Sequence, residues 1–264
     1  MRIFTLLVLI IVLHASAYSQ DIKTGIIYYD HIDNHYGVSY NSYLVFNQNK
    51  SHFVTYKDSL GLSNQKIDSG SEETLVEIAD FDDISKTRKK GLQVYLDKSK
   101  DSIYFSNAFS LISRVIYAKE KIPDFKWKFE SATKKIGKFL CKKAVTKFRG
   151  REYICWYTEE IPLPYGPWKL QGLPGIILEA KTRDGFFKMV FKKIKYPEQQ
   201  LKVPTSKIMI LPKGKKFISL DKYIGRQRKH IKETDNSLKI HAKKFGVHIE
   251  PFSEKDNFLE IFGQ

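Results

Sequence analysis

The chain has 264 residues, of which 42% are hydrophobic and 14% aromatic, so it fits one domain with a sizeable core and is not a disordered chain. Its 45 Lys and Arg residues against 29 Asp and Glu give a formal net charge of +16. Anionic partners are one interpretation, but lysines that alternate with apolar residues, as in Phe187–Lys192, favour the solvated face of a sheet.

The N-terminus has the three-part layout of a secretory signal peptide, assigned to residues 1–19. Arg2 supplies a positive charge, Ile3–Leu13 is apolar except for one threonine, and small residues follow. Cleavage fits after Ala17 or after Ser19, and the second site is favoured; an uncleaved anchor is the alternative. No later apolar run is long enough to span a bilayer. The sequence therefore predicts a periplasmic or extracellular protein with no transmembrane span after cleavage and no nucleic-acid partner.

Residues 20–264 are predicted to form a single β-rich domain. Apolar and aromatic runs separated by short polar turns indicate successive antiparallel strands. The predicted strands are Thr24–Tyr29, Tyr43–Asn47, His52–Tyr56, Leu92–Leu96, Ser102–Phe105, Arg114–Glu120, Phe125–Phe129, Lys138–Phe148, Glu152–Thr158, Ile176–Lys181 and Phe186–Tyr196.

Two segments depart from this pattern. Residues 58–90 are polar and rich in serine, which predicts a variable excursion with a short helix near 72–78. Ser219–Phe245 begins with an N-cap residue, has apolar residues at helical spacing and ends before Gly246, which predicts a C-terminal helix. The expected fold is mainly β with this helix: a curved antiparallel sheet, built as a meander and resembling half a barrel.

The two cysteines of this exported chain invite a disulfide. If Gly150 and Arg151 form the turn between two strands, Cys155 lies opposite Thr146, and Cys141 is five positions away on the other sheet face. That offset exceeds the roughly 7 Å Cα separation that a disulfide can bridge. We therefore expect two unbridged thiols.

The segment Glu159–Pro174 is rich in proline, glycine and aromatic residues. Proline fixes φ and removes a hydrogen-bond donor, so this segment cannot be a regular strand. Two interpretations remain: a rigid lip that binds a ligand or partner, or a loop that plugs one end of the curved sheet. Glu159, Glu160 and Lys169 are its only charged residues, which favours the plug.

No sequence signature of a nucleophile elbow, zinc protease, phosphate loop or dinucleotide fold is present. His31 and His35, with Asp30 and Asp33, form the one local cluster of metal-ligand types. We interpret this cluster as a surface loop at a strand end rather than a metal site. No catalytic residue, metal or cofactor is therefore predicted, and the sequence favours a non-enzymatic protein.

An ordered set of motifs carries a resemblance to a known family: Trp127, Ile136–Ala144, Gly150–Arg151, Trp156–Thr158, Glu160–Pro162, Gly166–Trp168 and Gly172–Glu179. This block resembles the central part of the GLPGLI family, with Gly-Leu-Pro-Gly-Ile-Ile in place of the eponymous hexamer. Asn257–Phe262 is similar to the family's closing segment, whereas Cys155 is not part of the pattern. The resemblance implies an exported bacterial protein of unassigned activity, with these candidate functional residues: Trp127, Pro162, Gly166, Pro167, Trp168, Gly172, Leu173, Pro174, Gly175 and Glu179.

Three functions remain open. The first is a binding or carrier-like envelope protein whose curved sheet holds a lipid-like, apolar or anionic ligand. The second is an interaction module that binds an envelope protein of the outer-membrane or secretion machinery. The third is an unrecognised hydrolase.

Overall fold

The computed structural model describes residues 24–33, 38–55, 92–109, 114–197, 211 and 214–262. The predicted signal peptide, residue 35 and the polar excursion with its short helix lie outside the described residues.

The described strands form one open 12-stranded sheet, ordered β12-β6-β5-β4-β3-β2-β1-β11-β10-β9-β8-β7. One antiparallel meander comprises β2 (Val38–Phe46), β3 (Lys50–Thr55), β4 (Gln93–Asp97), β5 (Ser102–Asn107) and β6 (Ile116–Lys121). A second comprises β7 (Lys128–Ile136), β8 (Phe139–Phe148), β9 (Arg151–Thr158), β10 (Ile176–Thr182) and β11 (Lys188–Lys195). The strand β1 (Gly25–Asp33) joins them by pairing with both β2 and β11. The predicted fold class, a curved and unclosed antiparallel sheet, is confirmed.

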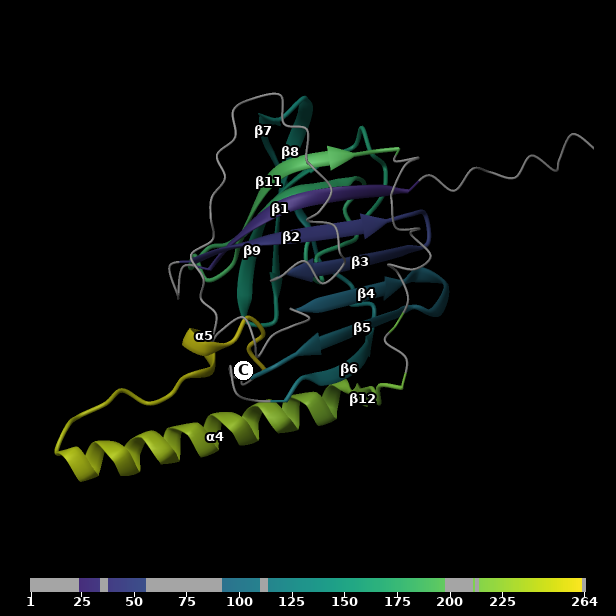
Figure 1. The fold of residues 1–264 in the computed structure, drawn as a ribbon. Coiled ribbons are helices and arrows are strands. Elements are labelled where there is room, and N and C mark those ends of the chain that lie inside the picture. Colours follow the sequence, from purple (N-terminus) through teal and green to yellow (C-terminus); the bar gives the residue numbers. More distant parts are fainter. Residues whose placement is uncertain are drawn as a thin grey trace, which may run out of the picture.

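The sheet bends so that its second meander lies behind its first, and the core fills the space between them. Figure 1 shows β9 running steeply behind the nearly horizontal front strands. Tyr29, Phe53 and Phe105 enter this core from the front, and Tyr153 and Phe187 enter it from the back. The two parts are also joined by a hydrogen bond, because the Tyr29 hydroxyl donates to the carbonyl of Ile177 at 2.6 Å.

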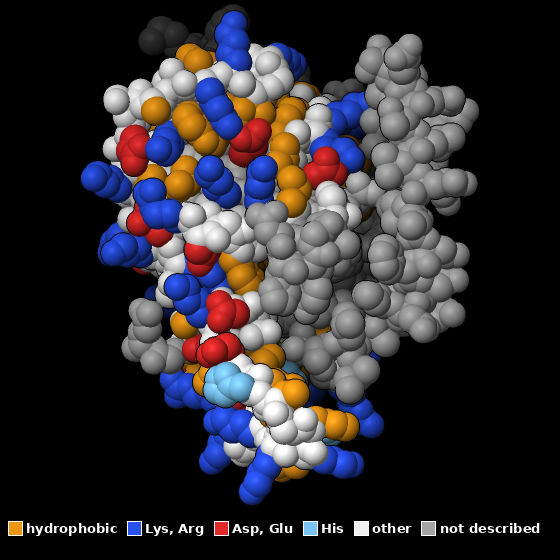
Figure 2. All heavy atoms as spheres, turned by 90° about the vertical axis from the view of Figure 1, so that its left-hand side faces the viewer, with side chains coloured by type: hydrophobic (Ala, Val, Ile, Leu, Met, Phe, Trp, Pro, Cys, Tyr) orange, Lys and Arg blue, Asp and Glu red, His pale blue; other side chains and the backbone are white. Residues whose placement is uncertain are grey.

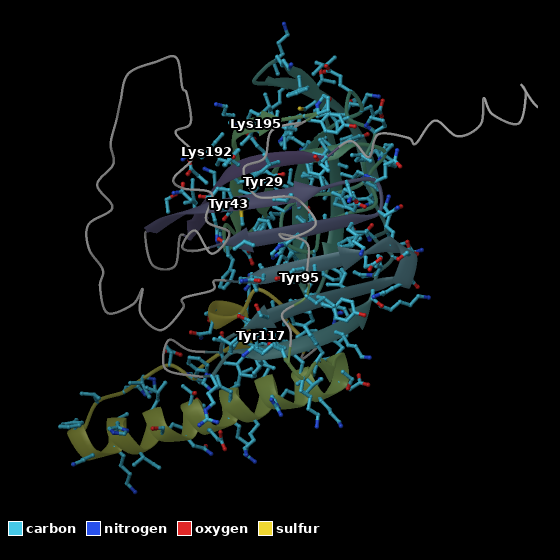
Figure 3. The ribbon with its side chains drawn as sticks, turned by 45° about the vertical axis from the view of Figure 1, so that its right-hand side comes forward. Tyr29, Tyr43, Tyr95, Tyr117, Lys192 and Lys195 are labelled. Carbon is cyan, nitrogen blue, oxygen red and sulfur yellow. The ribbon has the colours of Figure 1, made fainter. Side chains whose placement is uncertain are left out.

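The other face of the front strands carries a separate set of aromatic residues, including Tyr43, Tyr95 and Tyr117 (Figure 3). Tyr43 lies directly opposite Tyr28 in the ladder, with ring centroids 5.3 Å apart. Tyr95 stacks on His52 at 3.8 Å. All five residues of β4 are buried, so both faces of this strand are shielded from solvent.

The predicted C-terminal helix is present as α4 (Leu220–Phe245). The Ser219 side chain caps its start by accepting from the amide of Lys222, and Gly246 ends it in the left-handed conformation. The first half of α4 lies along β6 and β12 (Ile218–Ser219), and its second half extends beyond the sheet (Figure 1). The short helix α5 (Glu254–Asn257) then precedes the C-terminal segment 258–262. Among the described residues, no helix is long and apolar enough to cross a membrane.

Two sequence-based assignments were wrong. A strand was expected at Phe125–Phe129, but β7 begins at Lys128 and continues to Ile136. This strand is at the sheet edge and most of its side chains are exposed, so its sequence lacks the apolar signal of a strand. The hairpin turn between β8 and β9 is Arg149–Gly150 rather than Gly150–Arg151, because both of its residues have positive φ, 48° and 72°.

Candidate functional site

The segment between β9 and β10 folds back into the interior of the bent sheet. Three short-range hydrogen bonds shape it: Leu163 N to Ile161 O at 2.8 Å, Tyr165 N to Leu163 O at 2.9 Å, and Gly172 N to Pro164 O at 3.0 Å. We call residues 159–175 the core loop. These bonds pair part of its backbone locally, where proline excludes a regular strand.

Trp168 occupies the centre of the core loop and is only 4% exposed, so the burial expected of a plug is confirmed. Its ring stacks on Tyr153, with centroids 5.7 Å apart, and also contacts Phe148 and Phe187 at 5.8 and 6.0 Å. Its φ is +57°, which is unfavourable for a bulky side chain. The surrounding packing therefore fixes Trp168 in a conformation that the backbone alone would not choose.

Two glycines of the core loop are required by close packing. A Cβ atom on Gly175 would lie 2.0 Å from the carbonyl oxygen of Thr158. One on Gly166 would lie 2.6 Å from the Cδ1 atom of Ile177. These glycines let the loop approach the neighbouring strands more closely than any side chain would allow.

The other candidate residues divide by position. Pro167 and Leu173 are buried with Trp168, whereas Pro162, Gly172 and Pro174 are exposed on the rim. Trp127, which precedes β7, is half-buried, and its indole N–H donates to the carbonyl of Gln171 at 3.0 Å. Through this bond, Trp127 attaches the part of the core loop around Gln171 to the segment before β7.

Glu179 lies on β10, away from this packing, and forms an ion pair with Lys134. The Lys134 ammonium also lies 4.6 Å from the ring centroid of Trp156. The structure therefore brings the loop residues together but leaves Glu179 in a separate contact between strands.

The core loop contributes one residue to a buried ionic cluster that the sequence did not reveal. We define it as Glu120, Arg149, Lys169 and Glu260. The Lys169 ammonium lies 2.6 Å from Oε1 of Glu120 and 2.8 Å from Oε2 of Glu260. Arg149 contacts the other Glu120 oxygen at 2.5 Å and Oε1 of Glu260 at 3.7 Å. The Lys169 side chain is 0% exposed, so two cations and two anions neutralise each other inside the protein.

Burial raises the pKa of the Glu260 carboxyl, because desolvation outweighs the attraction of Lys169; the neighbouring Glu120 adds to the rise. The ring centroid of Phe105 lies 3.5 Å from the Lys169 ammonium. The cluster thus combines an amine and two carboxyl groups in a largely apolar setting.

Arg151 joins the same region to the C-terminal segment. Its guanidinium donates to the carbonyls of Leu259 and Phe258 at 3.1 and 2.7 Å, and also contacts Asp184. The amide of Ile261 donates to the carbonyl of Arg149 at 3.1 Å. The closing segment noted in the sequence is therefore part of the core-loop structure. A lone Lys169 within an apolar segment was the one available sequence signal of this cluster, since its partners are far along the chain.

The cysteines lie three positions out of register, not five, because the corrected turn places Cys155 opposite Ala144. Both thiols are free and buried, and burial raises the pKa of Cys141 to about 11. His31 is not in a surface loop as expected. It lies in β1, is 9% exposed and shares a 3.1 Å hydrogen bond with Thr55. No group of three metal-ligand residues is present in the described part of the chain.

These features define a class of protein: an open, bent antiparallel sheet whose interior is closed by its own loop. Residues 149–179 match the family model described as "Protein of unknown function (Porph_ging)". The match confirms the resemblance to the GLPGLI family, and it covers Arg149, Arg151 and the whole core loop.

No curated protein matches the chain. Among solved structures, the chain is similar to PNGF-II in space group P21, with 16% identity and a TM-score of 0.51 over 77% of this chain and 32% of that one. PNGF-II in space group C2 gives 18% identity and a TM-score of 0.47 over 74% and 30% of the two chains. The chain thus spans about a third of PNGF-II, and at this identity the likeness concerns the fold alone.

Proposed function

We propose that this protein is a non-enzymatic binding module of the cell envelope that docks on a phosphate-bearing, anionic membrane surface. The contact surface would be the far part of α4 and the residues just after it, 238–247, which we call the helix tip. The observation that supports this most strongly is the combination of exposed apolar side chains and lysines on a helix that projects past the sheet (Figure 1).

The apolar part of the helix tip is unusually exposed. Ile240 and Phe245 are 69% and 70% exposed, Leu238 is 40% exposed, and Val247 is 56% exposed. Several large, exposed apolar side chains within one ten-residue segment are more typical of a contact surface than of a solvated helix.

The charge of α4 fits the proposed surface. The helix has eight Lys and Arg residues against three Asp and Glu, and Lys239, Lys243 and Lys244 lie in the helix tip. Figure 2, which faces this end of the molecule, shows Lys and Arg side chains around the protruding end, with hydrophobic side chains between them. A basic helix with exposed apolar residues binds anionic lipid surfaces by combining burial with electrostatic attraction.

A carrier that holds a ligand inside the bent sheet is less well supported. Trp168, Leu170 and Leu173 of the core loop are each at most 4% exposed and pack in the core between the two meanders. The protein's own loop thus takes the position that an apolar ligand would need.

The proposal is tested by sedimentation of the full chain with phosphatidylglycerol-containing vesicles and with phosphatidylcholine vesicles. We expect binding to the anionic vesicles only, weakened by salt. The substitution F245S should weaken it about tenfold, because a buried Phe contributes roughly 1.5–3 kcal/mol. The pair K243E/K244E should weaken it at least tenfold, at about 1 kcal/mol per basic residue.

The matched control is K128E/K135E. Lys128 and Lys135 are exposed on β7, at the opposite end of the strand order from the strands beside α4, and their reversal changes the net charge equally. This variant should keep most of the binding. An equal loss of vesicle binding in both charge variants would contradict the proposal, and so would wild-type protein that does not sediment with anionic vesicles.

A further inference from the structure

The ionic cluster places an amine at hydrogen-bond and ion-pair distances from two carboxyl groups. The Nζ atom of Lys169 lies 2.9 and 2.8 Å from the two carboxyl oxygens of Glu260. It also lies 2.6 Å from Oε1 of Glu120. Each residue comes from a different part of the chain: Glu120 from β6, Lys169 from the core loop and Glu260 from the C-terminal segment.

The side chains of this cluster are less exposed to solvent than those of ordinary surface ion pairs. The side chains of Lys169, Glu120 and Glu260 are 0%, 3% and 7% exposed. The Phe105 ring packs against the amine. In such a setting a charged pair is costly, and converting it into a neutral group removes that cost.

We propose that Lys169 and Glu260 become joined by an intramolecular isopeptide bond that the protein forms by itself. Lys169 is the nucleophile and the Glu260 carboxyl carbon is the electrophile. Glu120 carries protons between them.

Arg149 contacts both carboxyl groups of the proposed reaction. Its Nη2 atom lies 2.5 Å from Oε2 of Glu120, so it positions that carboxyl group beside the lysine ammonium. Its Nε atom lies 3.7 Å from Oε1 of Glu260, where it faces the negative charge that develops when the amine attacks.

The reaction is balanced without any further reactant. Glu120 takes a proton from the Lys169 ammonium and passes it to the Glu260 carboxylate, and the neutral amine then adds to the carbon of the resulting carboxylic acid. Glu120 takes a second proton from the newly bonded nitrogen and gives it to the departing hydroxyl. The carbon–oxygen bond breaks, and this oxygen leaves as water with two of the three original ammonium protons. One amide N–H remains on Nζ. The fixed geometry replaces a bimolecular encounter, which is the main obstacle to amide formation between separate groups.

The bond would fasten the core loop covalently to the C-terminal segment that Arg151 also holds. One end of the proposed link, Glu260, lies in the motif Asn257–Phe262, and the other, Lys169, directly follows the motif Gly166–Trp168. The proposed cross-link would then hold these two parts of the chain together.

The test is the mass of the denatured full chain, followed by tryptic peptide mapping. We expect a mass lower than that of the processed sequence by one water molecule. Trypsin should no longer cleave after Lys169, and one branched peptide should contain both Lys169 and Glu260. Peptide mapping also separates this loss from cyclisation of an N-terminal glutamine, which releases ammonia at a different position.

Two variants test the roles. K169R should show the full mass, because it lacks the amine. E120Q keeps the shape of the side chain but cannot carry the proton, so its linked fraction should fall at least tenfold. A wild-type protein of full mass, or one with separate Lys169 and Glu260 peptides, would overturn the proposal whatever the variants do, and unchanged linkage in E120Q would overturn the role of Glu120.

Discussion

Lys169 shows, at the scale of single residues, what the sequence could and could not reveal. Its segment has few charges, and this low charge content correctly indicated burial of Trp168. The same reasoning only counted Lys169 among the few charged residues of the segment and did not predict that its side chain is 0% exposed. A sequence displays the residue but not its partners, because Glu120 and Glu260 are brought to Lys169 by the fold.

Trp168 is expected to be a major contributor to stability. W168A should lower the free energy of unfolding by about 3–5 kcal/mol, because it removes a buried ring and leaves a cavity among Tyr153, Phe148 and Phe187. Urea denaturation of the variant beside wild type measures this. The control is F129A, since Phe129 is 58% exposed and its loss should change the free energy by less than about 0.5 kcal/mol. Equal effects of the two substitutions would contradict the plug interpretation.

At the scale of elements, the strength of the local pattern decides what could be predicted. The helix α4 has a cap residue, apolar spacing and a terminal glycine, and its expected bounds agree with the structure to within one residue. The strand β7 has no apolar pattern, because it is an edge strand and most of its side chains are exposed rather than packed in the core. The two-residue strand β12 and the four-residue helix α5 are set by tertiary contacts and have no sequence period to detect.

Glycines in two elements should respond oppositely to alanine. G175A should destabilise the protein by about 3 kcal/mol, because the new methyl group would lie 2.0 Å from a backbone oxygen. G225A should stabilise it by roughly 0.5–1 kcal/mol, because Gly225 lies inside α4 and a Cβ atom there meets nothing within 4 Å. Thermal melts of both variants check the signs. A neutral G175A would show that the strand before the core loop can move aside.

At the scale of the whole molecule, the order of the strands was only partly predictable. Within each meander, neighbours in sequence are neighbours in space, and the short polar turns indicate this directly. The pairing of β1 with β11 connects the first described strand with the last strand of the second meander, and no local pattern encodes it. The bend that brings β9 behind the front strands depends on that pairing and on the core loop filling the interior (Figure 1).

The buried thiols and phenols of this core should make the whole fold sensitive to alkali. Burial raises the pKa of Cys141 to about 11 and raises the pKa of Cys155 further. Burial likewise raises the pKa of Tyr29 and of Tyr153. In each case the folded pKa exceeds the unfolded one, so the stability is complete below the unfolded value and declines as pH rises toward the folded value. For the thiols, the decline begins near the unfolded pKa of about 8.5.

We therefore expect the free energy of unfolding, measured in urea from pH 7 to pH 10, to be level at first and then to fall. Each thiol contributes a slope of at most about 1.4 kcal/mol per pH unit between its unfolded and folded pKa values. The double variant C141A/C155A is the matched control. It should be less stable at neutral pH, because both side chains are buried, but its stability should fall less steeply between pH 8.5 and 9.5 than that of wild type. Parallel curves for the two proteins would show that the thiols ionise equally in the folded and unfolded states and are not enclosed by the core.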